Sequence, residues 1–267
     1  MPELPEVTTI QKQLQKKIRN KIIKKVIFKD KRVLKGTSPN KFRLAVEGTT
    51  IKDILRRGKV LILSLREDLY LVFHLRISGW LRVSSKHEDF SRVIFELSDG
   101  RSFQFCDRRV LGEIRLINDW RALPIIKTMG PEPFDIDRHE FVRLCRGKKT
   151  KIKPLLMDQR FLAGVGNIYA QEALFYAGVH PHTPTHTIPK KTLEKIYASL
   201  IGVLKEAIRQ QGSSIDSYRH INGEEGNFVS FLKVYQRENE PCCVCNTQVE
   251  REVIGGRGTY FCPRCQK

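Results

Sequence analysis

The chain has 267 residues and carries 48 Lys and Arg against 29 Asp and Glu, which gives a formal net charge of +19 at pH 7. This length has room for two compact domains and a small appendage. Because so large a positive charge repels itself, it favours a polyanionic partner over a merely soluble basic surface.

Hydropathy and cysteine usage restrict the cellular compartment. No apolar run reaches the ~18 residues that a membrane-spanning helix needs, and the first residues lack the pattern of a signal peptide. Five of the seven cysteines lie between positions 242 and 265, unlike a secreted disulfide framework. We therefore expect a cytoplasmic protein, nucleoid-associated if bacterial, with no membrane partner.

The first seven residues combine a nucleophile with two acids. Removal of Met1 would leave Pro2 as a secondary amine, which can attack an electrophilic carbon and form an iminium. Glu3 follows directly, and Glu6 comes three residues later on the same side of a helical turn. In an arbitrary protein such residues more often just open a helix, because Pro suits the first turn and Glu the helix dipole. The rest of the chain must decide between these interpretations.

The first half of the chain predicts one helix followed by strands. Apolar residues recur at helical spacing at Val7, Ile10, Leu14 and Ile18. The period then changes to two, with short β-rich runs at residues 59–65, 69–75, 92–97 and 102–107. Strands at this spacing favour an antiparallel sandwich or barrel. We expect a β-sandwich with an N-terminal helix over residues 2–133.

The pattern then turns helical, with apolar residues at helical spacing within 141–145, 155–158, 168–177 and 192–210. We assign this helical domain to residues 134–228. The run Gly164-Val165-Gly166-Asn167 places Asn167 as an N-cap, beside helix N–H groups that can hold a phosphate, although alone it is more often a tight turn. The polar segment 211–227 is long for a connector and suggests a functional loop.

The C-terminal residues carry a metal-ligand pattern. Cys242-x2-Cys245 and Cys262-x2-Cys265 are separated by sixteen residues, the spacing of a Cys₄ zinc ribbon. Four thiolates close the tetrahedron, so we expect one structural Zn²⁺ within a β-hairpin domain over residues 232–267. Between the knuckles, Arg257 lies in the glycine-rich run 255–259, where an arginine is well suited to bind a phosphate.

Several separate motifs, in the same order, resemble the bacterial formamidopyrimidine-DNA glycosylases, a family that also contains endonuclease VIII. The resemblance covers the chain from end to end. Besides the four cysteines, it rests on Pro2-Glu3-Leu4-Pro5-Glu6-Val7, Arg57-Gly58-Lys59, His74-Leu75-Arg76-Ile77-Ser78-Gly79, Gly130-Pro131-Glu132-Pro133, Lys153-Pro154-Leu155-Leu156-Met157-Asp158-Gln159 and Ala163-Gly164-Val165-Gly166-Asn167-Ile168-Tyr169-Ala170.

The resemblance implies an α+β, multidomain fold: a β-sandwich, a helix–two-turns–helix domain and a zinc finger, with DNA bound between them. It implies that Pro2 is the nucleophile at C1′ of a damaged deoxynucleotide, that Glu3 is the proton donor and that Glu6 supports the reactive end. Lys59 matches a lysine that contacts a phosphate and assists catalysis. Arg257 matches a residue that grips the phosphates beside the lesion.

The resemblance also implies a set of DNA-binding residues. Asn167 matches a second phosphate-gripping residue, and His74 and Tyr235 are candidates for backbone contacts. The wedge that fills the gap in the base stack corresponds to Ile77, Arg109 and Leu111. Purine-type members usually carry Met, Arg and Phe there, so both substituted residues remain apolar but neither stacks as an aromatic.

The function expected from the resemblance is a bifunctional DNA glycosylase and abasic-site lyase of base excision repair. It would act as a monomer on double-stranded DNA with oxidised bases or abasic sites, excising oxidised purines such as 8-oxoguanine and formamidopyrimidines through a Pro2 Schiff base and β,δ-elimination. One alternative is an endonuclease VIII type that acts on oxidised pyrimidines. Another is a non-catalytic damaged-DNA-binding protein, against which the intact Pro2, Glu3 and Lys59 argue.

Overall fold

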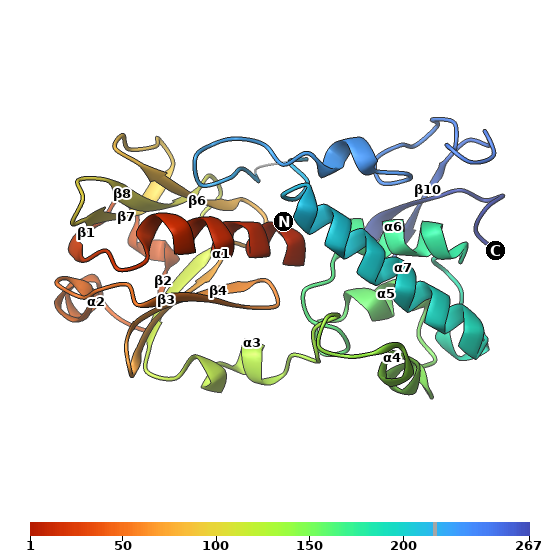
Figure 1. Ribbon diagram of the computed structural model, residues 1–267, viewed down its shortest axis with the longest axis horizontal. Coiled ribbons are helices and arrows are strands. Elements are labelled where there is room, and N and C mark those ends of the chain that lie inside the picture. The colour runs from red at the N-terminus through yellow and green to blue at the C-terminus, as the bar shows by residue number, and fades with distance from the viewer. Residues whose placement is uncertain (216–217) are drawn as a thin grey trace. The chain divides into compact units, whose positions relative to one another are not determined.

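The computed structural model describes residues 1–215 and 218–267, and these form two compact units. Unit 1 contains Met1–Lys127 and Gln210–Val229, and unit 2 contains Thr128–Arg209 and Ser230–Lys267 (Figure 1). The predicted domain boundaries at 2–133, 134–228 and 232–267 stay a prediction. Within the described ranges, no helix is both long enough and apolar enough to span a bilayer.

Unit 1 is built on two sheets. The four-stranded sheet has the order β1 (Ile23–Phe28), β7 (Ser91–Leu97), β8 (Ser102–Asp107) and β6 (Gly79–Ser84). The five-stranded sheet has the order β2 (Leu34–Lys35), β9 (Glu113–Ile117), β5 (Leu69–His74), β4 (Val60–Arg66) and β3 (Asp53–Arg57). All pairs are antiparallel except β2 with β9. The predicted sandwich is confirmed.

Aromatic side chains join the two sheets. Phe73 on β5 lies with its ring centroid 6.2 Å from Phe95 on β7 and 5.6 Å from Phe103 on β8. All three rings are fully buried. Edge-on and tilted ring pairs at such distances stabilise a core beyond the area they bury.

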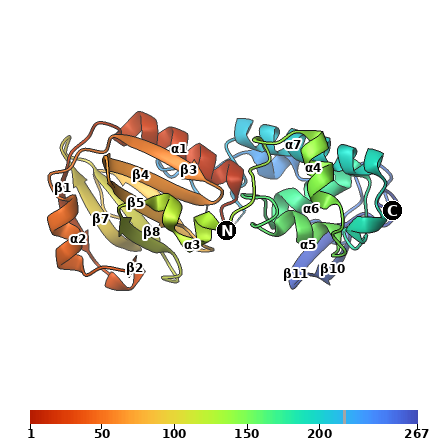
Figure 2. The ribbon, with the colours of Figure 1, turned by 90° about the horizontal axis from the view of Figure 1, so that it is seen from below.

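Helices complete unit 1. Helix α1 (Leu4–Ile18) buries the four predicted apolar residues and packs on β3 and β4, as Figure 2 shows. Gln11 and Gln15 on α1 donate to the carbonyl of Ile54 on β3, at 3.0 Å each, which fixes the helix along that strand. The remaining helical pieces of unit 1 are η1 (Lys31–Val33), α2 (Pro39–Val46), η2 (Trp120–Ala122) and α3 (Pro124–Lys127).

The segment 211–227, predicted as a functional loop, belongs to unit 1. Its positions 216 and 217 lie outside the described residues. An isolated bridge pairs Ser213 with Asn227. Tyr218 and Ile221 are buried in the unit 1 core, and Val83 N on β6 donates to the Ile221 carbonyl. These contacts dock the segment onto the sandwich. It leads into η4 (Phe228–Phe231).

Unit 2 contains the predicted helices with small shifts at their ends. They are α4 (Arg138–Cys145), α5 (Ile152–Met157), α6 (Asn167–Ala177) and α7 (Lys190–Arg209), with the short η3 (Thr185–Thr187) before α7. Helix α7 packs on α6 and α4. Gly178 ends α6 in the left-handed region, with φ of 73°, a conformation that glycine adopts without a steric penalty.

The zinc ribbon also belongs to unit 2. Strands β10 (Glu250–Ile254) and β11 (Arg257–Phe261) form an antiparallel hairpin whose turn is Gly255–Gly256, with φ of 60° and 74°. Positive φ at both turn residues is what the type I′ turn of a two-residue hairpin requires. The apolar residues around the knuckles pack on Phe175 of α6. The predicted hairpin is therefore confirmed, with Arg257 as the first residue of β11, directly after the tip.

Candidate functional site

The N-terminal residues are held by a buried carboxylate. Glu6 is 1% exposed, and its two oxygens accept from different backbone groups: Oε2 from Glu3 N at 2.8 Å and Oε1 from Ser213 N at 2.9 Å. Gly212 packs so closely that a Cβ there would lie 2.9 Å from Glu6 Oε1. Glu6 thus ties residues 2–3, which are also buried, to the segment after Gln210. The supporting role expected for Glu6 stays a prediction.

Lys59 lies in the turn that leads into β4, and β4 pairs with β5, the strand that ends at His74. Lys59 follows Gly58, with φ of 54°, in the tight turn between β3 and β4, and Val60 pairs with His74. Burial, then the nearby charge of Arg76, lowers the pKa of His74 to about 4. His74 Nδ1 accepts from Arg76 N at 3.1 Å. At neutral pH the ring is therefore uncharged, and Nε2 carries its proton and can donate to a phosphate.

The three wedge candidates lie on two loops of unit 1. Ile77 is 37% exposed and Leu111 is 48% exposed, so both apolar side chains are accessible to a ligand. Ile77 and Arg109 line the same cavity of about 910 Å³. Exposed apolar side chains beside an arginine suit insertion into a base stack.

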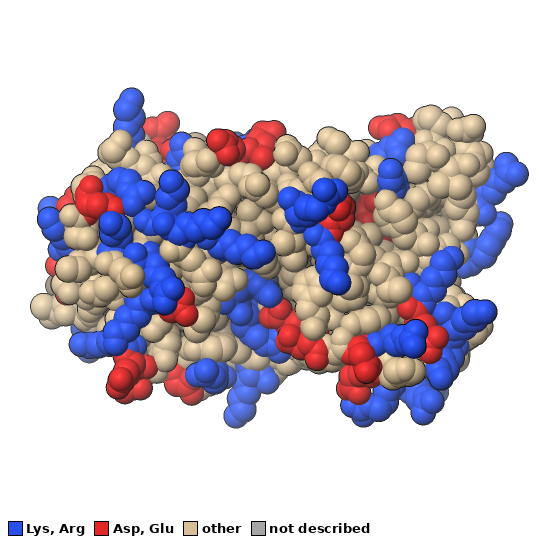
Figure 3. All heavy atoms as spheres, in the orientation of Figure 1, with Lys and Arg blue, Asp and Glu red and all other residues tan. Residues whose placement is uncertain are grey.

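That cavity is strongly basic, which the sequence did not predict. Besides Arg109, its lining includes Arg82, Arg108 and Arg219, with Glu88 as the acidic member. Arg82 Nε lies 2.9 Å from Glu88 Oε1, which partly neutralises the lining. Basic side chains, with acidic ones among them, are spread over the visible face of each unit (Figure 3).

In unit 2, the start of α6 is joined to the zinc hairpin. Asn167 Nδ2 donates to the Gly258 carbonyl at 3.1 Å, next to Arg257, whose side chain is exposed. Gln171, one turn later, accepts from Tyr260 N at 2.6 Å. The two predicted phosphate-gripping residues are therefore brought together. Asn167 is not the N-cap, however: Gly166 is, and Asn167 is the first helical residue, so its amide reaches the hairpin instead of capping.

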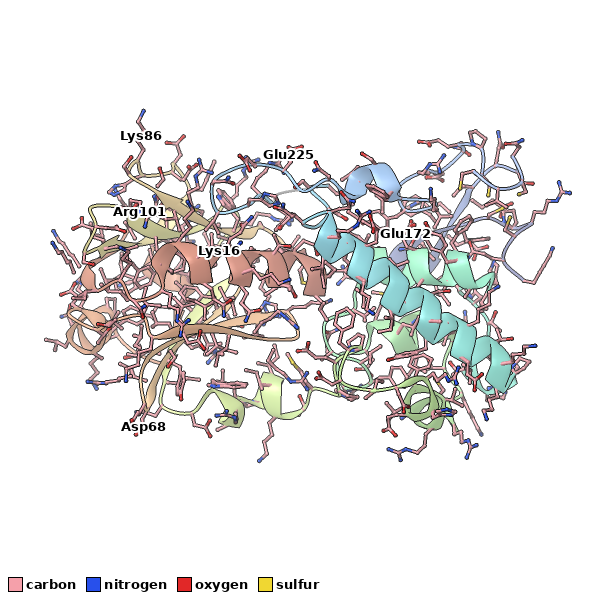
Figure 4. All side chains as sticks on the ribbon, in the orientation of Figure 1. Lys16, Asp68, Lys86, Arg101, Glu172 and Glu225 are labelled. Carbon is pink, nitrogen blue, oxygen red and sulfur yellow. The ribbon has the colours of Figure 1, made fainter. Side chains whose placement is uncertain are left out.

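A second buried carboxylate orders the segment that contains Tyr235. Glu172 of α6, labelled in Figure 4, is fully buried and accepts from the backbone N–H groups of Lys233, Val234 and Tyr235 at 2.9, 3.1 and 2.9 Å. Burial raises the pKa of Glu172, and the three N–H groups oppose that shift. The Tyr235 ring packs edge-on against Tyr260 at 5.6 Å. Tyr235 is thereby fixed to the same hairpin.

Two further buried residues escaped the sequence interpretation. Lys153 is fully buried, and its Nζ donates to Thr259 Oγ1 at 2.6 Å, which anchors the hairpin to α5. Glu172 has a sequence signal, because it is the one acidic residue in a helix whose other residues are mostly apolar. Lys153 has no such signal, because its partner lies 106 residues later.

The four predicted ligand cysteines form one cluster. Their Sγ atoms all lie within 4.8 Å of one another, with Cys242 to Cys265 at 3.9 Å and Cys245 to Cys262 at 3.4 Å. A tetrahedron with Zn–S bonds of about 2.3 Å has edges of about 3.8 Å, so the cluster fits one structural Zn²⁺. Cys243 is exposed and lies outside the cluster.

Comparison with known proteins gives a consistent result. The formamidopyrimidine-DNA glycosylase N-terminal domain matches residues 1–114, its H2TH domain matches 129–219, and the zinc finger found in FPG and IleRS matches 239–267. The formamidopyrimidine-DNA glycosylase of Mycoplasma mobile is 37% identical over 272 residues, covering 100% of this chain and 99% of that protein.

Solved structures agree. The Lactococcus lactis Fpg in complex with DNA containing an abasic site has a TM-score of 0.91 and 33% identity, over 99% of both chains. A mutant of the same protein in complex with DNA containing Fapy-dG has a TM-score of 0.92 and 33% identity, over 100% of both chains. The match in sequence, in fold and in all three parts of the chain shows that this protein belongs to the formamidopyrimidine-DNA glycosylase family of base excision repair enzymes.

Proposed function

We propose that this protein excises oxidised purines from double-stranded DNA and then cleaves the strand, with Pro2 as the nucleophile. The observation that carries the proposal is the buried arrangement at the N-terminus, where Glu6 holds the Glu3 backbone while Glu3 adjoins Pro2. An acid within a few ångströms of a secondary amine supplies both groups that the chemistry needs.

The reaction begins once Met1 is removed. The Pro2 amine attacks C1′ of the extruded nucleotide, the bond from C1′ to the base breaks, and the amine gives up its proton. Glu3 then donates a proton to O4′ as the C1′–O4′ bond breaks, which opens the sugar ring and leaves an iminium between Pro2 and C1′. The resulting iminium acidifies the neighbouring sugar carbon, so successive β- and δ-elimination cleave the strand on both sides of the sugar. Because the target base lies inside a duplex, the nucleotide must first be flipped out, which costs a few kcal/mol.

Residues of both units contribute contacts to the phosphate backbone. Lys59 and Arg257 add positive charge, whereas His74 is neutral and contributes only a donated hydrogen bond. Asn167 and Tyr235 complete this set, supported by their contacts with the hairpin. Such contacts position the DNA without reading its sequence, and they make affinity fall steeply with salt.

The wedge formed by Ile77, Arg109 and Leu111 fills the gap that the flipped nucleotide leaves. Oxidised purines are our first choice of substrate, because the 211–227 segment resembles the one that closes over 8-oxoguanine in purine-type members. Ile77 and Leu111 stand where purine-type members usually carry Met and Phe. We therefore expect the preferences for the lesion and for the opposite base to differ from those of such members. We also keep as proposals a monomeric state and a cytoplasmic, nucleoid-associated location.

Borohydride trapping on a panel of lesion duplexes tests this function. We expect a covalent adduct with 8-oxoguanine, formamidopyrimidine and abasic duplexes, and none when an extra residue precedes Pro2. Faster release of thymine glycol than of 8-oxoguanine would favour the endonuclease VIII type. The absence of an adduct on every lesion would favour a non-catalytic DNA-binding protein.

A further inference from the structure

Two loops of unit 1 carry the wedge candidates. The first, residues 75–78, contains Ile77, and the second, residues 108–112, contains Arg109 and Leu111. Each loop includes a non-glycine residue in the left-handed region: Arg76 with φ of 52° and Val110 with φ of 57°. Residues with a Cβ avoid this region unless the surrounding structure compensates. Something must therefore hold both loops in shape.

The buried carboxylate of Asp107 contacts both loops. Asp107 ends β8 and is fully buried. Its Oδ1 accepts from Ser78 Oγ at 2.5 Å and from Arg109 N at 3.0 Å, and its Oδ2 accepts from Gly112 N at 2.6 Å. One side chain thus spans the second loop from Arg109 to Gly112 and joins it to the residue after Ile77.

The close packing around this carboxylate leaves it little freedom. A Cβ at Gly112 would lie 2.7 Å from the Phe105 ring, 3.1 Å from the His74 carbonyl and 3.2 Å from Asp107 Oδ2. Glycine is therefore required where the second loop returns to the sheet. The first loop closes equally tightly, since Gly79 N donates to the Leu75 carbonyl at 2.9 Å.

We propose that Asp107 is a positioning residue that locks the two loops together, so that Ile77, Arg109 and Leu111 enter the base stack as one preformed wedge. This inference rests on the proposed function. A carboxylate is suited to the task because it only accepts hydrogen bonds, and all three partners donate. Preforming the wedge removes the ordering cost that separate mobile loops would add when they insert.

The test uses four variants that change this contact in graded ways. Asp107→Asn keeps the shape of the side chain, but an NH₂ group replaces one of its two acceptor oxygens. That NH₂ group then faces at least one of the three groups that donate to Asp107. Ser78→Ala removes only the bond between the loops, and Ser78→Thr keeps the hydroxyl. The double variant of Asp107→Asn with Ser78→Ala reports whether the two residues act through each other. Ser91→Ala is the matched control, because Ser91 is also a buried serine of the sandwich that donates to a side chain, Gln104 Oε1, at 2.5 Å.

Wedge insertion is measured with a duplex that contains a tetrahydrofuran abasic analogue and a neighbouring 2-aminopurine, whose fluorescence rises when it is unstacked. Cleavage of a single strand with an abasic site is measured in parallel, since it needs no gap to be filled. Asp107→Asn should slow insertion and duplex excision on the order of tenfold or more, the scale of a lost charge-assisted hydrogen bond. Single-strand cleavage should stay within about twofold. Ser78→Ala should slow insertion and duplex excision less than Asp107→Asn, and Ser78→Thr should restore both rates. The double variant should be no slower than Asp107→Asn.

Insertion that is unchanged in both Asp107→Asn and Ser78→Ala, or equal losses in Ser91→Ala, would overturn the inference. If Asp107→Asn fails to fold, the Ser78→Ala and Ser78→Thr pair decides, because both keep the carboxylate. Failure of the proposed function looks different: the unaltered protein would then form no borohydride-trapped adduct with the single abasic strand.

Discussion

Each unit fixes a functional segment with a buried carboxylate, but the two arrangements differ in what reinforces them. In unit 1, Glu6 accepts from Glu3 N and Ser213 N, which are 210 residues apart in sequence. In unit 2, Glu172 accepts from three consecutive N–H groups, and the chain then continues into the zinc ribbon. In the part of the chain that the structure describes, the one metal-ligand cluster belongs to unit 2.

This difference separates two requirements of the proposed reaction. A segment that binds phosphates gains from fixed geometry, and thiolate–zinc bonds provide it. A reactive end that forms and releases a covalent sugar adduct is served by hydrogen bonds, which can break and re-form. We therefore expect perturbations of the Glu6 contacts to act mainly on chemistry, and those of the Glu172 contacts and the zinc ribbon mainly on affinity.

The largest effect is expected at the reactive end. Glu3→Gln removes a proton donor with little change of shape, so base excision should fall roughly 10²–10⁴-fold, the usual contribution of general acid catalysis. DNA affinity should be nearly unchanged. Single-turnover excision and fluorescence anisotropy measure the two separately. Unaltered turnover would refute the role of Glu3.

Zinc removal should instead act mainly on DNA affinity. Without the metal, the hairpin that carries Arg257 unfolds and the protein loses phosphate contacts, so affinity should fall on the order of 10- to 100-fold. The slope of affinity against salt concentration should become shallower. Titration of DNA after chelation, with metal content verified, is the measurement, and re-added Zn²⁺ is the control. Full affinity in verified metal-free protein would contradict this prediction.

Neutralising the two carboxylates compares the units directly. Glu6→Gln and Glu172→Gln each place an amide donor where the carboxylate accepted from backbone N–H groups, and each should destabilise the fold by about 1–3 kcal/mol. Glu172→Gln should also weaken DNA binding, whereas Glu6→Gln should reduce excision at nearly constant affinity. Chemical unfolding, combined with the same two assays, checks this. Identical profiles for the two variants would remove the distinction.

The smallest effect concerns His74. Its folded pKa of about 4 lies below the ordinary value of 6.5, so the unfolded state binds more protons between these values and stability falls as pH falls through that window. From pH 7 to pH 5.5 this group should cost about 1 kcal/mol. His74→Gln should flatten the dependence of Tm on pH in this range. An unchanged slope would show that other groups dominate.

Local spacing allowed the sequence to predict more of the fold than of the site. The zinc ligands follow a pattern within 24 residues and were predicted correctly. The short periods predicted α1, the long helices of unit 2 and the strands β4, β5, β7 and β8, but not β1, β2, β3, β6 or β9. Asn167 was misplaced as an N-cap because its amide binds the Gly258 carbonyl, 91 residues away. The Asp107 contacts, the burial of Lys153 and the lowered pKa of His74 likewise depend on tertiary packing, which spacing does not encode.

Unit 1 is made of two segments that are separated in the sequence, and this has a consequence for synthesis. Unit 1 begins at Met1 but is completed by Gln210–Val229, which leaves the ribosome only after most of unit 2. A nascent chain that stops before residue 213 therefore lacks the N–H that Glu6 Oε1 accepts. The contact between the N-terminal residues and Ser213 therefore forms late in translation, and a truncated product would contain Pro2 and Glu3 without it.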